Sequence, residues 1–482
     1  MGIRVIVIGA GPAGLATAIK LKENNVETLV IEKENKVGGI SKTKEYKGYR
    51  FDLGGHRFFT KSKDVNDIWD KMLGEDFMTR SRSSRIYYKN NFFLYPIKLF
   101  DALKGLGFWQ SALVGFSYAA SKLFPYKEEK TFEQWVSNRF GKRLFNIFFK
   151  TYTEKLWGIP CSEIQAEWAV QRIRGLSFSS AIRNAVFPDR NGKIKTLLSE
   201  FKYPRLGPGM MYEKMADKIK QMNGRIMMES EVDKVNRESF KVMSVEIKDK
   251  AGKTDKMEAD YFVSSMPITE LIEKLDPKPP QNISEAARNL AYRSFLSVNV
   301  ILKGSNFIPD NWIYIHSPEV KLGRIQNYKK WSPYMAPGEG CISLGLEYFC
   351  NEGDEFWLKP DEELIEIAVH ELEIIGLGEK RRLVDGFVIR VPKSYPVYDS
   401  KYPENMKIIR AYLDNFKNLQ PIGRYGMFKY NNMDHSILTG FYAAENILGA
   451  KHNIWEVNVD QEYQEEKKDA AGLESPEGAS SD

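Results

Sequence analysis

A short glycine-rich segment near the N-terminus has the residue types and spacing that bind a dinucleotide. The segment Gly9-Ala10-Gly11-Pro12-Ala13-Gly14 follows an apolar run and precedes a helical pattern. Gly9 permits a tight turn, Gly11 lets the backbone approach a pyrophosphate, and Gly14 allows the helix to pack closely on the strand. The pyrophosphate would lie at the helix N-terminus, where free N–H groups favour an anion. The motif therefore predicts a dinucleotide site.

The residues after this motif favour FAD over NAD. Glu32 lies 18 positions after Gly14 and is followed by Lys33, which places a carboxylate where it can accept hydrogen bonds from ribose hydroxyls. A second glycine pair, Gly38-Gly39, is followed by Ile40-Ser41, and flavoproteins use such a pair to let the long cofactor pass close to the backbone.

Two further segments extend the predicted cofactor site. A third pair of glycines, Gly54-Gly55, comes directly before His56. Residues Met227–Val235 are typical of the strand whose backbone, near Val232, touches the adenine in this class. The sequence therefore predicts an FAD protein.

The elements that must position these residues are typical of an α/β fold. Residues 3–9, 13–24 and 27–31 form a βαβ pattern, and strand patterns return at 224–250 and 294–350. We expect a Rossmann-type FAD-binding domain, a mixed-sheet substrate domain and a helical insertion. The expected FAD-binding domain is discontinuous (1–75, 205–270 and 405–450), with a helical substrate lid at 76–204 and a substrate-binding sheet at 271–404.

Local patterns predict several single elements. Helices are expected at 61–74, 99–123, 361–376 and 434–448. Two strands, 85–89 and 92–95, are expected to turn at Asn90-Asn91.

Composition excludes several classes of function. Lys+Arg 70 against Asp+Glu 64 gives a net charge of +6, too weak a bias to indicate a nucleic-acid partner. Cys161, Cys341 and Cys350 have no CxxC spacing, and the five histidines are scattered, so we expect reduced thiols, no metal site and a cytoplasmic protein. The polar stretch 467–482 is predicted to be disordered.

One uncharged stretch, residues 105–121, bears on membrane contact. It is shorter than the roughly 20 apolar residues that span a bilayer, so no transmembrane span is expected. A packed helix is the ordinary interpretation, and peripheral contact with a membrane surface is the alternative.

Beyond the glycine loop, several motifs resemble those of UDP-galactopyranose mutases, within the superfamily that includes amine oxidases and protoporphyrinogen oxidases. The resemblance covers nearly the whole chain up to about residue 448. It rests on these segments: Gly54–Phe59, Tyr152–Gly158, Ser394–Tyr398 and Gly423–Asp434.

The resemblance implies a nucleotide-sugar pyranose–furanose mutase for cell-surface glycan precursors. In that family the N5 atom of the reduced flavin is the covalent nucleophile, so no protein nucleophile is required. The electron source is open between NAD(P)H and a separate reductase, and the oligomeric state is open too.

The positions of this chain that match the mutase motifs imply roles for individual residues. The implied catalytic residues are His56, Arg174, Arg324 and Tyr430. The implied substrate-binding residues are Tyr152, Trp157, Tyr395 and Asn432. Arg424, Met433 and Asp434 are implied to lie at the flavin edge, at the N-terminus of the last predicted helix.

Two departures keep a second function open. The mutase motif usually carries aspartate where this chain has Asn432, and Phe201–Met210 is closer to protoporphyrinogen oxidases and amine oxidases. The alternative is an FAD-dependent oxidoreductase, of the amine oxidase, protoporphyrinogen oxidase or desaturase type, acting on an apolar or amine substrate.

Overall fold

Strand β1 (Arg4–Ile8) lies at the centre of a parallel sheet that is assembled from distant parts of the chain. The computed structural model describes residues 2–95, 97, 99–166, 200–304, 308–338 and 340–458. The strand order is β20-β13-β1-β2-β9, and every neighbouring pair is parallel. The other strands are β2 (Glu27–Ile31), β9 (Arg225–Met227), β13 (Tyr261–Ser264) and β20 (Leu419–Pro421).

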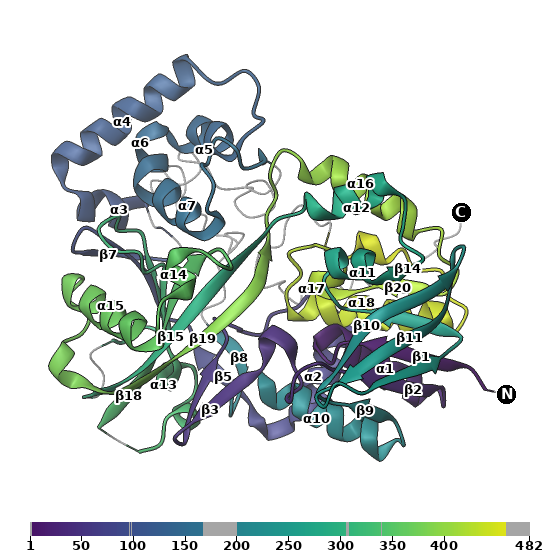
Figure 1. Cartoon of the computed structure of the whole chain (residues 1–482). Coiled ribbons are helices and arrows are strands. Elements are labelled where there is room, and N and C mark those ends of the chain that lie inside the picture. Colours follow the sequence, from purple (N-terminus) through teal and green to yellow (C-terminus); the bar gives the residue numbers. More distant parts are fainter. Residues whose placement is uncertain are drawn as a thin grey trace, which may run out of the picture.

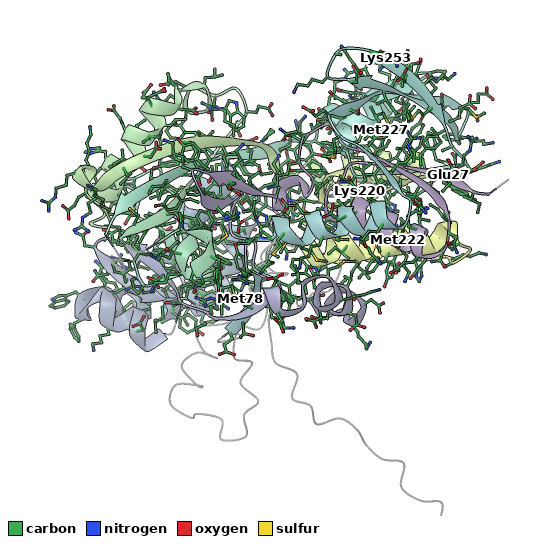
Figure 2. All side chains as sticks on the ribbon, turned by 90° about the horizontal axis from the view of Figure 1, so that it is seen from below. Glu27, Met78, Lys220, Met222, Met227 and Lys253 are labelled. Atoms are coloured by element: carbon green, nitrogen blue, oxygen red, sulfur yellow. The ribbon has the colours of Figure 1, made fainter. Side chains whose placement is uncertain are left out.

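Alternation along β1 explains why both faces of this sheet are covered. Val5 and Val7 face one hydrophobic cluster, and Ile6 and Ile8 face another. Four helices contribute to the first cluster: α1 (Pro12–Glu23), α2 (Lys63–Leu73), α10 (Gly209–Gln221) and α18 (Met433–Ile447). Figure 2 shows Lys220 and Met222 of the α10 region near Met227 of β9.

The second face packs on a smaller sheet of order β12-β11-β10-β14 and on helices. These strands are β10 (Ser230–Glu238), β11 (Lys241–Asp249), β12 (Thr254–Glu258) and β14 (Leu275–Asp276). The helices are α11 (Ile268–Lys274), α12 (Gln281–Arg288) and α16 (Tyr402–Leu413).

A seven-stranded sheet of order β19-β15-β18-β17-β16-β6-β7 forms the other half of the molecule (Figure 1). Its pairs are antiparallel except β16 with β6. Helix α15 (Asp361–Ile374) packs on one face. The strands are β6 (Ser84–Tyr88), β7 (Asn91–Leu94), β15 (Tyr292–Lys303), β16 (Trp312–Ile315), β17 (Arg324–Asn327), β18 (Cys341–Cys350) and β19 (Leu383–Pro396).

A helical region lies beside this sheet in Figure 1. Two local predictions were wrong in detail, one in this region and one in the hairpin of β6 and β7. The single helix expected at 99–123 is two helices, α3 (Leu99–Leu106) and α4 (Phe108–Leu123), because Gly107 adopts a φ of +80° that ends the first. The hairpin turns at Lys89 and Asn90, both with positive φ, and Asn91 already belongs to β7.

The rest of the helical region consists of α5 (Phe132–Phe140), α6 (Lys142–Phe145), a π-helical turn (Asn146–Lys150) and α7 (Thr151–Trp157). Two short pairs, β3 (Thr43–Tyr46) with β4 (Tyr49–Asp52) and β5 (Phe77–Ser81) with β8 (Glu200–Pro204), complete the strands that matter for the site.

The predicted α/β class with mixed sheets is confirmed by this architecture. All three cysteines are free thiols. Among the described residues, no helix is long and apolar enough to cross a bilayer. The tail expected at 467–482 lies outside the described residues.

Candidate active site

A single cavity of about 1600 Å³ runs from the N-terminal glycine loop to the helical region. Its wall is contributed by the parallel sheet, by β15 and β19 of the large sheet and by α5 and α7. Pockets for one small ligand usually enclose roughly 300–1,000 Å³. This cavity therefore has room for a large cofactor and a second ligand.

The glycine loop presents open backbone to one end of the cavity. Gly9, Gly11, Pro12 and Ala13 line it, and a Cβ atom added at Gly11 would meet nothing closer than the Cα of Gly39, at 3.9 Å. A Cβ at Gly14 would instead collide with the carbonyl oxygen of Gly9. Gly11 thus leaves space for a ligand, whereas Gly14 permits the turn itself.

Glu32 lies at the end of β2 with its carboxylate held by the backbone. It accepts from the N–H of Ala10 (2.6 Å) and of Glu34 (2.9 Å). Burial raises the pKa of Glu32, and these two hydrogen bonds oppose that rise. Glu32 and Lys33 both line the cavity, as the ribose-binding prediction requires.

The adenine-side prediction falls on β10. Val232 lines the cavity, and its carbonyl oxygen accepts from Lys274 Nζ (2.7 Å). On the other side of the glycine loop, Gly38 and Gly39 have φ values of +105° and +55°, which bring Ile40 and Ser41 to the cavity wall.

His56 lies deeper in the cavity, after Gly55, which also lines it. The Nδ1 atom of His56 is buried and makes no hydrogen bond to the described part of the chain. Burial, reinforced by the charges of Arg424 and Arg324, lowers the pKa of His56 to about 3. The imidazole is therefore neutral, and Nδ1 is available to a bound ligand.

The C-terminal motif brings backbone and charge to the same region. Arg424 donates from Nε and Nη2 to the carbonyl oxygen of Ser394 (2.8 and 2.6 Å). Asn432 is the N-cap of α18, and its N–H donates to His435 Nδ1 (3.3 Å). Met433 and Asp434, in the first turn of α18, line the cavity beside Asn432.

Aromatic side chains form the next part of the wall. Tyr395 and Tyr430 stack with ring centroids 5.8 Å apart, and the Arg424 guanidinium lies 4.1 Å from the Tyr430 centroid. Trp157 lies 6.3 Å from Tyr430. The structure thus brings two of the predicted substrate-binding residues, Trp157 and Tyr395, together with the predicted catalytic residue Tyr430.

Tyr152, the third aromatic residue predicted to bind the substrate, lies on α7. It stacks on His316 with centroids 5.0 Å apart and rings 12° from parallel. Burial, together with the neighbouring Lys155 charge, lowers the pKa of His316 to about 3, so this ring is neutral as well.

Arg324 reaches the cavity from β17, and sequence reasoning missed its partner. Glu347, on β18, is fully buried and accepts from Arg324 Nε (2.9 Å) and from Gln326 Nε2 (2.8 Å). The Tyr395 hydroxyl lies 3.4 Å from Arg324 Nη2. The sequence feature that could have indicated Glu347 is a single carboxylate within the apolar stretch 341–350, since a buried carboxylate requires a partner.

The cavity ends in an apolar wall under the helical region. The residues of this wall are aliphatic or aromatic, and all are buried or half-buried: Ile86, Ala102, Phe140, Leu144, Phe148 and Phe149. Phe148 and Phe149 belong to the π-helical turn, an irregularity often found at functional sites.

One residue predicted for this site cannot be located in the described part of the chain. Arg174 lies outside the described residues. Within the part of the chain that the structure describes, no cluster of metal-ligating side chains is present.

Solved structures share this fold. A reduced UDP-galactopyranose mutase aligns with a TM-score of 0.81 and 21% identity, over 93% of this chain and 94% of that one. A protein described as a putative protoporphyrinogen oxidase from Exiguobacterium sp. 255-15 aligns with a TM-score of 0.72 and 15% identity, over 93% and 99%.

The sequence also matches a curated mutase. A dTDP-fucopyranose mutase from Escherichia coli is 27% identical over 173 residues, which are 34% of this chain and 44% of that protein. The chain spans 12%, 44% and 11% of the length of three curated relatives that it matches, the mutase being the second of these.

A family profile covers almost the whole chain. The profile described as flavin containing amine oxidoreductase matches residues 12–448, from α1 to just after α18. The cofactor is FAD, and the open backbone at Gly11, the carboxylate of Glu32 and the unpartnered Nδ1 of His56 fit it. The chain therefore belongs to the flavin-containing amine oxidoreductase family, in which it resembles the UDP-galactopyranose mutases.

Proposed function

We propose that this FAD enzyme interconverts the pyranose and furanose forms of a nucleotide-linked sugar. The observation that carries the proposal is the lining of the cavity by five arginines together with a group of tyrosines. The arginines are Arg57, Arg82, Arg324, Arg390 and Arg424. Guanidinium groups bind diphosphate oxygens in a bidentate manner, and aromatic faces bind a nucleobase or a sugar.

Each side chain has a distinct task under this proposal. Glu347 holds the Arg324 fork in one orientation, so that its outer N–H groups can meet a diphosphate that leaves and returns. Tyr430, in contact with both Tyr395 and Arg424, offers a hydroxyl to the same phosphates. The neutral ring of His56 would hydrogen-bond the cofactor through Nδ1.

Bound FAD supplies, when reduced, a nucleophilic nitrogen for the anomeric carbon. The proposal thus requires from the protein only binding, orientation and exclusion of water. Arg174 and Asn432 stay part of the proposed substrate site, with Tyr152 and Trp157 flanking the nucleotide. The proposed FAD-binding domain still consists of 1–75, 205–270 and 405–450.

The test is interconversion by the dithionite-reduced holoenzyme, followed chromatographically with pyranose and furanose forms of UDP- and dTDP-sugars. Arg324→Lys keeps a charge but removes the fork, and we expect about a 100-fold lower rate. Arg85→Lys is the matched control, because Arg85 also pairs with a buried carboxylate, Asp310, but does not line the cavity. No interconversion of any sugar nucleotide by the reduced parent enzyme would contradict the proposal.

The apolar wall favours a second candidate, an oxidoreductase acting on an apolar or amine substrate. Ile86, Phe140, Leu144 and Phe148 suit a hydrocarbon better than a phosphate. This candidate predicts that a polyene or amine bleaches the oxidised flavin in the absence of air, whereas the mutase predicts no change in flavin absorbance with a sugar nucleotide.

A further inference from the structure

Helix α4 carries a stripe of large apolar side chains on its outer face. Trp109, Leu113, Phe116 and Leu123 lie at spacings of four, three and seven residues, which places them on one side of the helix. Trp109, Phe116 and Leu123 are 74–78% exposed, and Leu113 is 45% exposed. In Figure 1, α4 runs along the outer edge of the helical region, with no described element on its outer side.

The inner face of α4 is mixed, with Val114 and Tyr118 packed in a hydrophobic cluster and two serines hydrogen-bonded to neighbouring segments. The Ser111 hydroxyl donates to the carbonyl oxygen of Leu103 (2.7 Å), and the Ser117 hydroxyl accepts from the N–H of Arg143 (3.0 Å). Val114 is the one residue of α4 that is fully buried in the described structure. A helix on a water-facing surface normally carries polar and charged residues on its outer face. The outer face of α4 is therefore suited to apolar surroundings.

Aromatic residues extend the stripe at both ends of the helix. Phe108 is 78% exposed and Phe124 is 83% exposed. Aromatic side chains carry roughly 150–250 Å² each, so Phe108, Trp109, Phe116 and Phe124 together expose about 500 Å² or more. The largest apolar patch on an ordinary monomer is roughly 300–600 Å² and is often functional.

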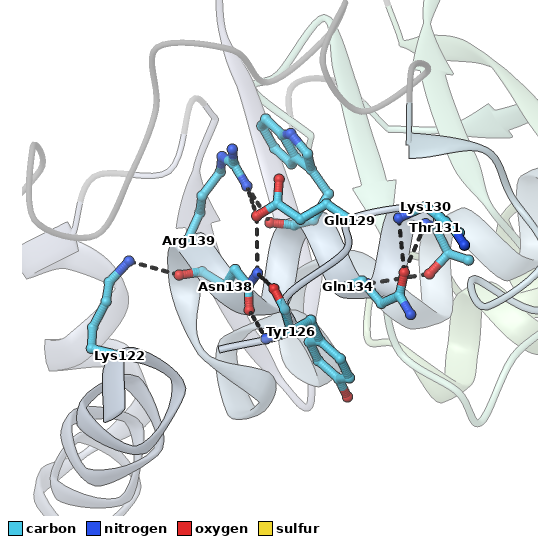
Figure 3. A network of polar contacts seen from close by, with 9 residues as sticks. Lys122, Tyr126, Glu129, Lys130, Thr131, Gln134, Asn138 and Arg139 are labelled. Carbon is cyan, nitrogen blue, oxygen red and sulfur yellow. Dashed lines mark hydrogen bonds and ion pairs between the residues drawn. The ribbon is translucent and has the colours of Figure 1, made fainter. Parts of the chain in front are cut away.

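The C-terminal end of the stripe is held in place by a polar network (Figure 3). The Asn138 side chain accepts from the N–H of Tyr126 and donates to its carbonyl oxygen, both at 2.9 Å. Lys122 Nζ donates to the carbonyl oxygen of Asn138 (2.7 Å). Because hydrogen bonds hold the chain both before and after Phe124, at Lys122 and at Tyr126, the backbone at Phe124 has a defined position.

Within α4 and up to four residues on either side of it, every charged residue is a lysine. Between Asp101 and Glu128 the chain contains no acidic residue, whereas it contains Lys104, Lys122 and Lys127. Lys104 and Lys127 are exposed at the two ends of the helix. A partner for this face therefore combines an apolar layer with negative charges at its border, which describes a bilayer with anionic headgroups.

We propose that α4 docks the protein on an anionic lipid bilayer. The helix, with 16 residues and a length of roughly 24 Å, lies in the plane of the interface with its apolar stripe among the first acyl carbons. Lys104 and Lys127 meet lipid phosphates. The inner side of the same region forms the apolar end of the cavity, through Ala102 and Phe148, so docking brings that end toward the membrane.

The experiment is flotation of the full FAD-loaded chain with vesicles. We expect the protein to float with phosphatidylglycerol-containing phosphatidylcholine vesicles and much less with pure phosphatidylcholine. The double variant Trp109→Ser/Phe116→Ser should reduce the bound fraction at least about ten-fold, because two exposed aromatic anchors are lost. Lys104→Gln/Lys127→Gln should reduce binding to anionic vesicles by about five-fold per lysine.

Leu358→Ser is the matched control, since Leu358 is 68% exposed on α14 (Glu355–Leu358), away from α4. It should float like the parent, and all variants should retain FAD absorbance. The proposal is overturned if the parent does not float, or if the double variant floats as well as the parent. It is also overturned if light scattering shows a dimer of the parent that the double variant disrupts while vesicle binding is absent.

Discussion

Arg324 and Glu347 lie directly opposite each other on the antiparallel strands β17 and β18, and their side chains form a buried ion pair at the cavity wall. Burying two charges is costly, and their attraction offsets that cost only while both are present. Arg324 also faces the cavity, so a single pair serves both the stability of the sheet and the proposed binding of phosphate.

Breaking this pair from the Glu347 side should therefore destabilise the protein. We expect Glu347→Leu to lower the free energy of unfolding by about 3–5 kcal/mol, because Arg324 is left with an uncompensated charge. The double variant Arg324→Met/Glu347→Leu should recover most of that loss. Urea unfolding followed by tryptophan fluorescence measures both, and equal losses in the single and double variants would argue against a coupled pair.

Two glycine substitutions should separate cofactor binding from folding. Gly11→Ala has room within the protein, so we expect a folded chain that binds FAD at least about ten-fold more weakly. Gly14→Ala collides with the Gly9 carbonyl oxygen and should lower expression and thermal stability. Circular dichroism and the flavin absorbance of the purified variants distinguish the two. Full FAD content in Gly11→Ala would contradict the placement of the pyrophosphate.

Asp52 should make stability fall with rising pH. Burial raises its pKa to about 7, although the Tyr203 and Thr43 hydroxyls donate to it and oppose the rise. Between pH 4 and 7 the folded state holds a proton that the unfolded state has lost. The contribution of Asp52 to the free energy of unfolding is therefore complete below pH 4 and is lost as pH rises through 7. Its upper limit is about 4 kcal/mol.

Asp52→Asn should remove this dependence, so that the melting temperature changes less than in the parent between pH 5 and 8. Thermal unfolding across that range provides the measurement. Parallel pH curves for the two proteins would show that the carboxyl is ionised in the folded state throughout.

His56 should stay neutral across the physiological range. Its pKa is lowered to about 3, so the imidazole gains no proton between pH 5 and 8. Nitrogen NMR of the His-labelled protein, assigned with His56→Gln, should show no titration of this ring. An inflection near pH 6.5 at His56 would mean that the ring is open to water and charged when no ligand is bound.

Local sequence patterns predicted the parts of the site that are formed by residues close together in the chain. The turn at Gly9–Gly14 and the carboxylate of Glu32 could be placed because one strand, one turn and one helix determine them. Glu347 could not be placed, because its partner Arg324 is set by the register of two strands 23 residues apart. The prediction of one helix at 99–123 was wrong at Gly107, whose positive φ divides the segment into two helices. An apolar sequence pattern gives no information about this backbone angle.

The parallel sheet has a consequence for how the protein is made. Its edge strand β20 and the helix α18, which packs on α1, come from the last described part of a chain whose first strand is β1. During synthesis the glycine loop leaves the ribosome some 400 residues before α18, whose first turn lines the same cavity. The nascent chain must therefore keep its dinucleotide loop without a complete binding site, and capture of FAD becomes a late event in biogenesis.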